Sequence, residues 1–203
     1  FKRNKDDVAA KVIGIEYDPN RTCHIALLRY EDGTLRYILS PRGLNDGTEI
    51  VSSNGAIEPQ PGNCMPLKYI PTGLTVHNIE FEPGKGGKLC RSAGSGARLS
   101  NKEGRWATLV LPSGEIRQVS VECRATVGQI GNTDHQNVKI GKAGANRWRG
   151  RKPKVRGVAK DHACHPLGGG EGRSKGGREP ASASGTKSKG GRTRARGKWT
   201  DSR

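Results

Sequence analysis

Short runs in which apolar and polar residues alternate, separated by turn signals, make up the first two thirds of the chain. Such alternation is typical of a strand with one face on a core and the other in water. Asp32-Gly33 lies between two of these runs and is a strong hairpin signal, because glycine adopts positive φ without steric cost. The pattern predicts strands over residues 8–17, 24–30, 34–39, 48–51, 74–81, 88–93, 97–100, 105–111, 115–122 and 124–130.

Helix signals are few, so the pattern predicts an all-β protein. The only stretch that predicts a helix is 142–148, where Ala143, Ala145 and Trp148 share a face. Strands at this spacing favour small antiparallel barrels over an α/β sheet. We predict a first barrel over residues 1–60, a second over 73–138, and between them a proline- and glycine-rich linker over 61–72.

The net charge of +17 lies almost entirely in residues 139–203, here called the tail. The preceding part, 1–138, has 17 Lys/Arg and 15 Asp/Glu, whereas the tail has 19 and 4. Six of these cations crowd into ten consecutive residues, and no acid of the tail comes before Asp161: Arg147, Arg149, Arg151, Lys152, Lys154 and Arg156. A basic segment of this kind, made flexible by its glycines, cannot bury a hydrophobic core. It is suited to binding phosphates, and we expect it to fold only when its partner is bound. A solvated tail without a partner is the alternative.

The composition favours RNA recognised by shape and phosphate over stacked single strands, because aromatic residues make up only 4% of the chain. A free module that binds duplex DNA stays open as an alternative. A smaller basic patch at Lys85, Lys88, Arg91 and Arg98 is either a second phosphate contact or a solvated face.

His165 precedes a glycine run, Gly168, Gly169 and Gly170, followed by Arg173. Glycines beside an arginine can bring backbone N–H groups close to phosphates, but the run lacks the ending of a nucleotide P-loop. His165 could serve as a general base in a transferase or hydrolase. No orienting acid or nucleophile stands at a recognisable spacing, so we predict a structural or RNA-contacting histidine and no catalytic residue.

We expect neither a metal site nor a membrane span. Asp161, His162, Cys164 and His165 cluster without zinc-finger spacing, so we predict no bound metal and no cofactor. Five cysteines, odd in number and widely spaced, argue against a disulfide framework and for a reducing compartment. No apolar run approaches the length of a transmembrane helix.

Several of these motifs resemble the universal large-subunit ribosomal protein two family in its bacterial type. The resemblance covers residues 1–175 and lies in Arg147-Trp148-Arg149-Gly150, Val155–Ala159, His165-Pro166, Gly168–Arg173, Phe1–Lys5, Tyr17–Arg21, Pro83–Gly87, Arg91–Gly94 and Gly141–Gly144. It implies an oligonucleotide-binding-type barrel, then an SH3-like barrel, then an extended tail. It also implies a non-enzymatic constituent that binds large-subunit rRNA, supports subunit joining and reaches toward the peptidyl-transferase centre.

The resemblance extends the expected RNA contacts to Lys2, Arg3, Lys142 and Trp148, and His165 matches a family histidine once suspected in catalysis. The implied partners are large-subunit rRNA with its own structural Mg²⁺, small-subunit rRNA or proteins at the subunit interface, and neighbouring ribosomal proteins, with no membrane. The family's segment before Phe1 is missing, which predicts a trimmed or split chain. Lys160–Cys164 and the residues after Arg178 also depart from the family. These differences favour a mitochondrial or other organellar ribosome over the bacterial cytoplasm.

Overall fold

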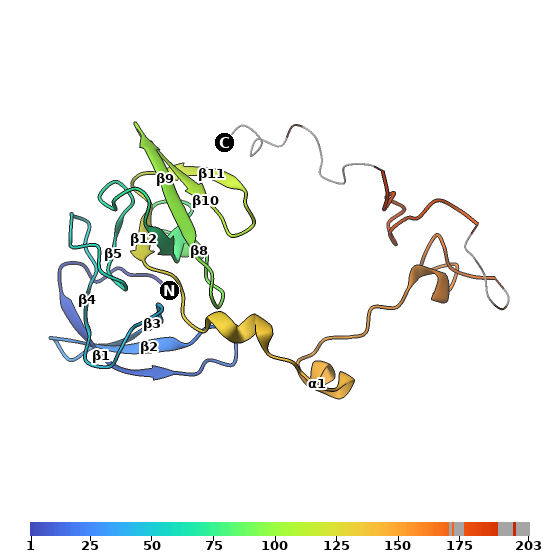
Figure 1. Ribbon diagram of the computed structural model, residues 1–203, viewed down its shortest axis with the longest axis horizontal. Helices are drawn as coiled ribbons and strands as arrows, with labels where there is room; N and C mark the ends of the chain where they lie inside the picture. The colour runs from blue at the N-terminus through green and yellow to red at the C-terminus, as the bar shows by residue number, and fades with distance from the viewer. Residues whose placement is uncertain (171, 173–176, 191–196, 198–203) are drawn as a thin grey trace. The chain divides into compact units, whose positions relative to one another are not determined.

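The computed structural model describes residues 1–170, 172, 177–190 and 197. It divides into two compact units, Phe1–Val138 and Lys139–Arg203. The prediction of an all-β protein with a basic extension is confirmed. Figure 1 shows the strands of the first unit and the largely strand-free chain of the second.

The first sheet is antiparallel, with strand order β3-β2-β1-β4. Its strands are β1 (Ala9–Glu16), β2 (Ile25–Tyr30), β3 (Leu35–Leu39) and β4 (Glu49–Val51). The register between β1 and β2 shifts between Val12 and Gly14, which leaves Ile13 as an extra, exposed residue. The inward face holds the core of the first barrel: Ala10, Val12, Ala26, Leu28, Tyr30, Ile38, Leu44 and Ile50.

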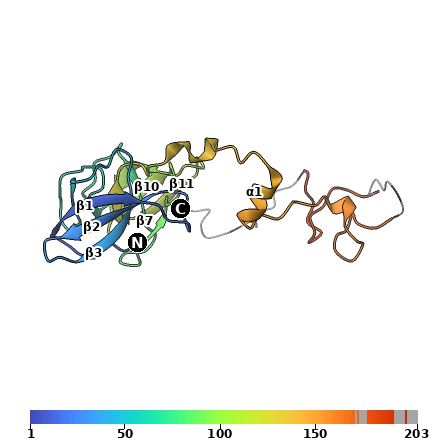
Figure 2. The same cartoon turned by 90° about the horizontal axis from the view of Figure 1, so that it is seen from below.

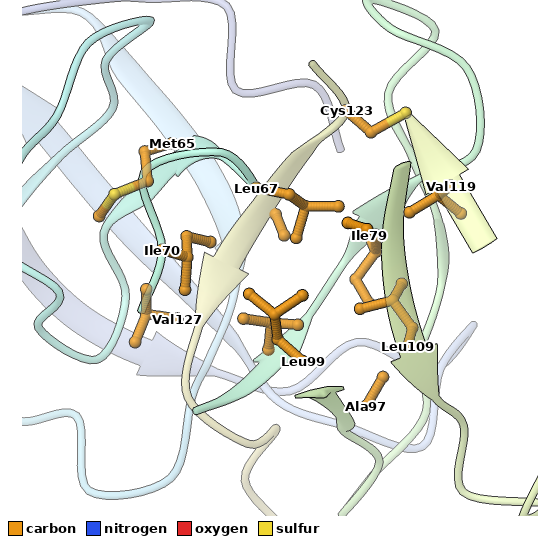
Figure 3. Close-up of a cluster of buried hydrophobic side chains, with 13 residues drawn as sticks. Met65, Leu67, Ile70, Ile79, Ala97, Leu99, Leu109, Val119, Cys123 and Val127 are labelled. Atoms are coloured by element: carbon orange, nitrogen blue, oxygen red, sulfur yellow. The ribbon is translucent and has the colours of Figure 1, made fainter. Parts of the chain in front are cut away.

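The second sheet has the order β11-β10-β9-β6-β12-β5. Its strands are β5 (Cys64–Pro66), β6 (Thr75–His77), β9 (Ala97–Glu103), β10 (Trp106–Val110), β11 (Ile116–Ser120) and β12 (Arg124–Val127). A two-stranded ribbon, β7 (Ile79–Glu80) and β8 (Gly87–Leu89), lies beside it. Figure 3 shows side chains that meet in one core, among them the fully buried Leu99 of β9 and Leu109 of β10.

The predicted linker over 61–72 is wrong as an element that lies outside the barrels. Residues 64–66 form β5, which pairs with β12, and Leu67 and Ile70 are fully buried in the second core. β5 is an edge strand, the position at which a sheet tolerates a proline such as Pro66. The proline and glycine content of this stretch concealed three buried core side chains, Met65, Leu67 and Ile70.

The predicted strand over 74–81 is interrupted at Asn78, which adopts a left-handed backbone with φ 48°. Asparagine is one of the few residues that tolerate this conformation. The break separates β6 from β7 and directs the chain into the β7–β8 ribbon. That ribbon and its loop carry two members of the smaller basic patch, Lys85 and Lys88.

The two barrels pack on each other within the first unit. A small core shared by the two barrels consists of Cys23, Leu39 and Ile130. Pro41 and Ile130 also form an isolated antiparallel β-bridge. Ser52 bridges to Cys64 in a parallel sense. Backbone bonds and apolar contacts thus fix the first barrel against the second.

The described residues of the second unit form one α-helix, α1 (Ala143–Trp148), and one 3-10 turn over Gly157–Ala159 (Figure 2). A further 3-10 turn, Thr133–Asn137, belongs to the first unit. Among the residues described after Val138, no hydrophobic side chain is buried. Within the described ranges, none of the helices is long and apolar enough to cross a membrane.

Candidate nucleic-acid interface

Three lysines predicted to bind RNA come together on the first unit, although Lys2 lies far along the sequence from Lys85 and Lys88. Gly86 has φ +82°, and a Cβ placed on it would lie 3.0 Å from Cγ of Lys2. The aliphatic stem of Lys2 therefore packs on the backbone of the loop between β7 and β8. Lys85 precedes that glycine and Lys88 follows it two residues later; both lysines are exposed, and Lys85 pairs with Glu82. We call Lys2, Lys85, Lys88 and Arg91 the barrel patch.

Arg91, the fourth member of this patch, follows β8 and is half-buried. Its carbonyl oxygen accepts a hydrogen bond from the Cys23 thiol of the first barrel, with a sulfur–oxygen distance of 3.4 Å. Its Nε atom is buried and has no hydrogen-bond partner among the described residues. A buried guanidinium N–H without a partner is costly, so an acceptor from outside the chain would stabilise it. Arg98, predicted for the same patch, is exposed on β9.

Arg3 is not available to phosphate, which corrects its assignment as an RNA contact. Its side chain is buried; Nε donates to Oγ of Ser52 at 2.9 Å and a terminal nitrogen donates to the carbonyl of Gly62 at 3.1 Å. Burial lowers the pKa of Arg3 from its usual value. The residue links the N-terminal segment to both barrels, a role that the short basic sequence Lys2-Arg3-Asn4-Lys5 does not reveal.

Arg21 is a cation in the same region that sequence reasoning did not select. Its guanidinium carbon lies 4.4 Å from the centre of the Phe1 ring, and its Nε bonds Asp18 at 2.6 Å. The pKa of Asp18 is lowered, first by the Asn20 backbone N–H and then by Arg21. The turn motif Asp18-Pro19-Asn20-Arg21 was the signal in the sequence that could have pointed to Arg21, because it contains both Arg21 and its ion-pair partner Asp18.

The basic arm, residues 139–160, holds the densest group of cations. Among the described residues none of the following forms an ion pair with an acid, and all are exposed: Lys139, Lys142, Arg147, Arg149, Arg151, Lys152, Lys154 and Arg156. Trp148 is 76% exposed, and Nζ of Lys142 lies 4.9 Å from its ring centre. The arm presents uncompensated positive charge with one exposed aromatic face.

His165 is buried in a small loop formed by its own neighbours. Its Nδ1 accepts a hydrogen bond from the N–H of Leu167 at 3.1 Å, which requires a ring with no proton on Nδ1. A Cβ on Gly157 would lie 2.3 Å from Cε1 of this ring, so the imidazole packs directly on the glycine backbone. The contacts describe a histidine that organises its loop. An RNA contact by His165 stays a prediction.

The glycine run after His165 serves packing at two of its three positions. The N–H of Gly168 donates to the carbonyl of His165 at 2.9 Å, and that of Gly169 donates to the carbonyl of Lys160 at 3.0 Å. These two N–H groups are engaged within the loop, which corrects the expectation that they cradle phosphate. A Cβ on Gly168 would lie 2.4 Å from the carbonyl oxygen of Asp161, so only glycine fits there. Arg173, predicted as a phosphate contact, lies outside the described residues, and Gly170 is exposed.

The acid–histidine–cysteine cluster near His165 does not converge on one point. Nδ1 of His162 lies 3.0 Å from a carboxylate oxygen of Asp161, and both side chains are exposed. Within the described ranges, no three His, Cys, Asp or Glu side chains form a group able to hold a metal ion.

Two β-barrels that carry exposed lysines, followed by an unpaired basic arm, define a nucleic-acid-binding protein of the all-β class. Comparison with known proteins makes this specific. Residues 1–52 match the family described as Ribosomal Proteins L2, RNA binding N-terminal domain, and residues 60–185 match Ribosomal Proteins L2, C-terminal domain. The chain is 58% identical over 195 residues to the large ribosomal subunit protein uL2 of Laribacter hongkongensis (strain HLHK9), covering 96% of this chain and 70% of that protein.

The chain belongs to the ribosomal protein L2 family. The prediction of an RNA-binding ribosomal protein, first made from the motifs of the tail, is confirmed at this level.

Proposed function

We propose that this chain is a structural constituent of the large ribosomal subunit that binds large-subunit rRNA through the barrel patch and the basic arm. The single observation that carries the proposal is the basic arm itself, with eight exposed cations that no acid among the described residues compensates. Charges this close repel each other, and a polyanion relieves that repulsion. The relationship to a bacterial large-subunit protein supplies the identity of the polyanion.

The two surfaces suit different tasks. The barrel patch lies on the compact first unit, so it can select a fixed arrangement of phosphates on folded RNA. The basic arm has no buried apolar side chain among its described residues and takes its bound shape from the RNA. We propose that the arm fills gaps near the peptidyl-transferase centre, that the protein supports subunit association, and that its effect on peptide-bond formation is positional.

A catalytic role for His165 is the alternative from another class. The ring of His165 packs on Gly157, and Nδ1 is occupied by the N–H of Leu167. A general base must instead reach the proton that it removes. Replacement of His165 by alanine in reconstituted ribosomes should lower the rate of peptide-bond formation modestly. A loss of several orders of magnitude would favour the enzymatic reading.

The ribosome is the proposed location. Its compartment, bacterial cytoplasm or mitochondrion, is a separate proposal. The relative is bacterial, whereas the departures at Lys160–Cys164 and after Arg178 are the support for an organelle. Mass spectrometry of ribosomes purified from each compartment would decide between them.

The test is a salt titration of binding to a bacterial large-subunit rRNA transcribed in vitro. One variant replaces four cations of the basic arm by glutamine: Arg149, Arg151, Lys152 and Lys154. A control with the same net charge replaces four exposed cations of the first unit: Lys11, Arg29, Arg42 and Arg105. The slope of log K against log salt should fall by roughly 3 in the arm variant, at 0.7–0.9 per phosphate contact, and by less in the control.

Equal slope changes in the two variants would contradict the proposal, because they would show a dependence on net charge alone. Competition with duplex DNA at fixed salt tests the third reading, a free DNA-binding module. Equal affinity for duplex DNA and rRNA would favour that module.

A further inference from the structure

Glu80, the last residue of β7, is a buried carboxylate, 6% exposed, beside the barrel patch. No Lys or Arg forms an ion pair with it among the described residues. Three backbone N–H groups bond it instead. Oε1 accepts from Gly86 at 2.9 Å, and Oε2 accepts from Gly84 at 3.1 Å and from Arg124 at 3.1 Å. Several N–H donors on one carboxylate are the arrangement that keeps a buried negative charge stable without a cation.

Two of these donors belong to the loop that carries the lysines. Gly84 and Gly86 have φ +75° and +82°, so the loop adopts a conformation that other residues rarely do. Their N–H groups turn inward to Glu80, while Lys85 between them is exposed. The carboxylate thus selects the loop conformation in which Lys85 faces solvent.

The third donor ties the loop to the rest of the first unit. Arg124 opens β12, and its side chain bonds Asp6 at 2.5 Å and the carbonyl of Ser53 at 3.4 Å. The opposite side of the loop packs on Lys2 through Gly86. A single carboxylate therefore connects the loop with β12 and, through Arg124, with the first barrel.

From this geometry we infer that Glu80 is the positioning residue of the barrel patch, holding Lys85 and Lys88 where they bind two neighbouring rRNA phosphates. The inference rests on the proposed function, since it names the part of the chain that shapes one of the two RNA-binding surfaces. The role proposed for Glu80 is the opposite of what its negative charge alone would predict for RNA binding. A negative charge beside a phosphate-binding patch weakens binding through space, whereas this one strengthens binding by fixing the loop.

Glu80→Gln separates these two effects. Glutamine keeps one acceptor oxygen and places an NH₂ group against at least one backbone N–H, so the loop loses part of its anchor. Glu49→Gln on β4 is the matched control, because the Glu49 side chain is exposed and forms no hydrogen bond or ion pair with another described residue. Charge removal alone predicts equal or tighter binding of rRNA in both variants. Positioning predicts weaker binding in Glu80→Gln only.

The readout is the salt dependence of binding by the full chain to in vitro transcribed bacterial large-subunit rRNA. In Glu80→Gln the slope of log K against log salt should fall by about 1.5, the value for two lost phosphate contacts. Alanine at both Lys85 and Lys88 should weaken binding strongly in the parent chain and only slightly in the Glu80→Gln background. The NMR signals of the Gly84 and Gly86 amides should move as their hydrogen bonds are lost.

Unchanged or tighter binding by Glu80→Gln would overturn the inference, and so would weaker binding with an unchanged slope, which reports general loss of stability. If Glu80→Gln does not fold, Gly84→Ala carries the test. A Cβ at Gly84 meets no atom within 4 Å, so that change strains only the loop backbone and should lower the slope in the same way. If the parent chain binds rRNA without salt dependence, the proposed function fails instead.

Discussion

His77 should make the folded protein sensitive to mild acid. The ring is fully buried; Nδ1 donates to the carbonyl of Gly128 at 2.7 Å, and Nε2 is buried without a partner among the described residues. Burial lowers the pKa of His77 from 6.5 to about 4, partly opposed by the bond to Gly128 and assisted by the charge of Arg3. Protonation would place a second cation in this interior.

The magnitude follows from the two pKa values. In the unfolded chain His77 takes up its proton near pH 6.5, and in the folded chain near pH 4, so the unfolded state binds more protons between these values. The contribution of neutral His77 to the free energy of unfolding is therefore fully present above pH 6.5 and is lost as the pH drops toward 4. At ~1.4 kcal/mol per pKa unit the full loss is about 3 kcal/mol, and between pH 7 and 4.5 it is roughly 2 kcal/mol.

The assay is urea denaturation followed by circular dichroism at pH 7 and pH 4.5. His77→Asn keeps a donor for the carbonyl of Gly128 and cannot be protonated, so it should lack about 2 kcal/mol of the parent's acid sensitivity. His24→Asn, which changes an exposed histidine, is the control and should follow the parent. The reasoning is refuted if His77→Asn and the parent lose the same free energy of unfolding between the two pH values.

Three further predictions test the core, the His165 loop and the thiols. Leu109→Ala removes a fully buried side chain from the second core and should lower the free energy of unfolding by about 3 kcal/mol in the same urea assay. Gly157→Ala would place a methyl group 2.3 Å from the ring of His165, so NMR should show that ring displaced while the barrels keep their melting temperature; an unmoved ring would contradict the packing. Iodoacetamide at pH 8 should modify exposed Cys164 in the native protein and Cys123 only after denaturation, because burial raises the pKa of the Cys123 thiol to about 11. Peptide mass spectrometry identifies the modified cysteines, and modification of Cys123 before Cys164 would contradict this prediction.

The strands were predictable because their signal is local. Alternation placed β1, β2, β10 and β11 within a residue or two of their observed ends, and Asp32-Gly33 marked the first hairpin. α1 was predicted from three residues that share a face. The strand at Cys64–Pro66 was missed, because its prolines and glycines resemble a linker and its partner strand lies about 60 residues further along the chain.

The candidate site was predictable only as far as it depends on charge density. The basic arm is visible in the sequence because its cations are consecutive and lack acids, whatever the fold. The barrel patch was half visible: Lys85 and Lys88 lie close in sequence, but Lys2 joins them only because the N-terminal segment packs on Gly86 of the β7–β8 loop.

The sequence by itself determined the all-β class, the division between balanced and basic parts, and the family. Each of these follows from residues that are near neighbours along the chain. Only the tertiary structure decided what individual polar groups do. Arg3 and Lys2 are neighbouring cations, and Glu80 and Glu82 are neighbouring acids, yet Arg3 and Glu80 are buried and hydrogen-bonded within the fold while Lys2 and Glu82 are exposed. Burial and hydrogen bonding arise from the packing of distant segments, and no local pattern encodes them.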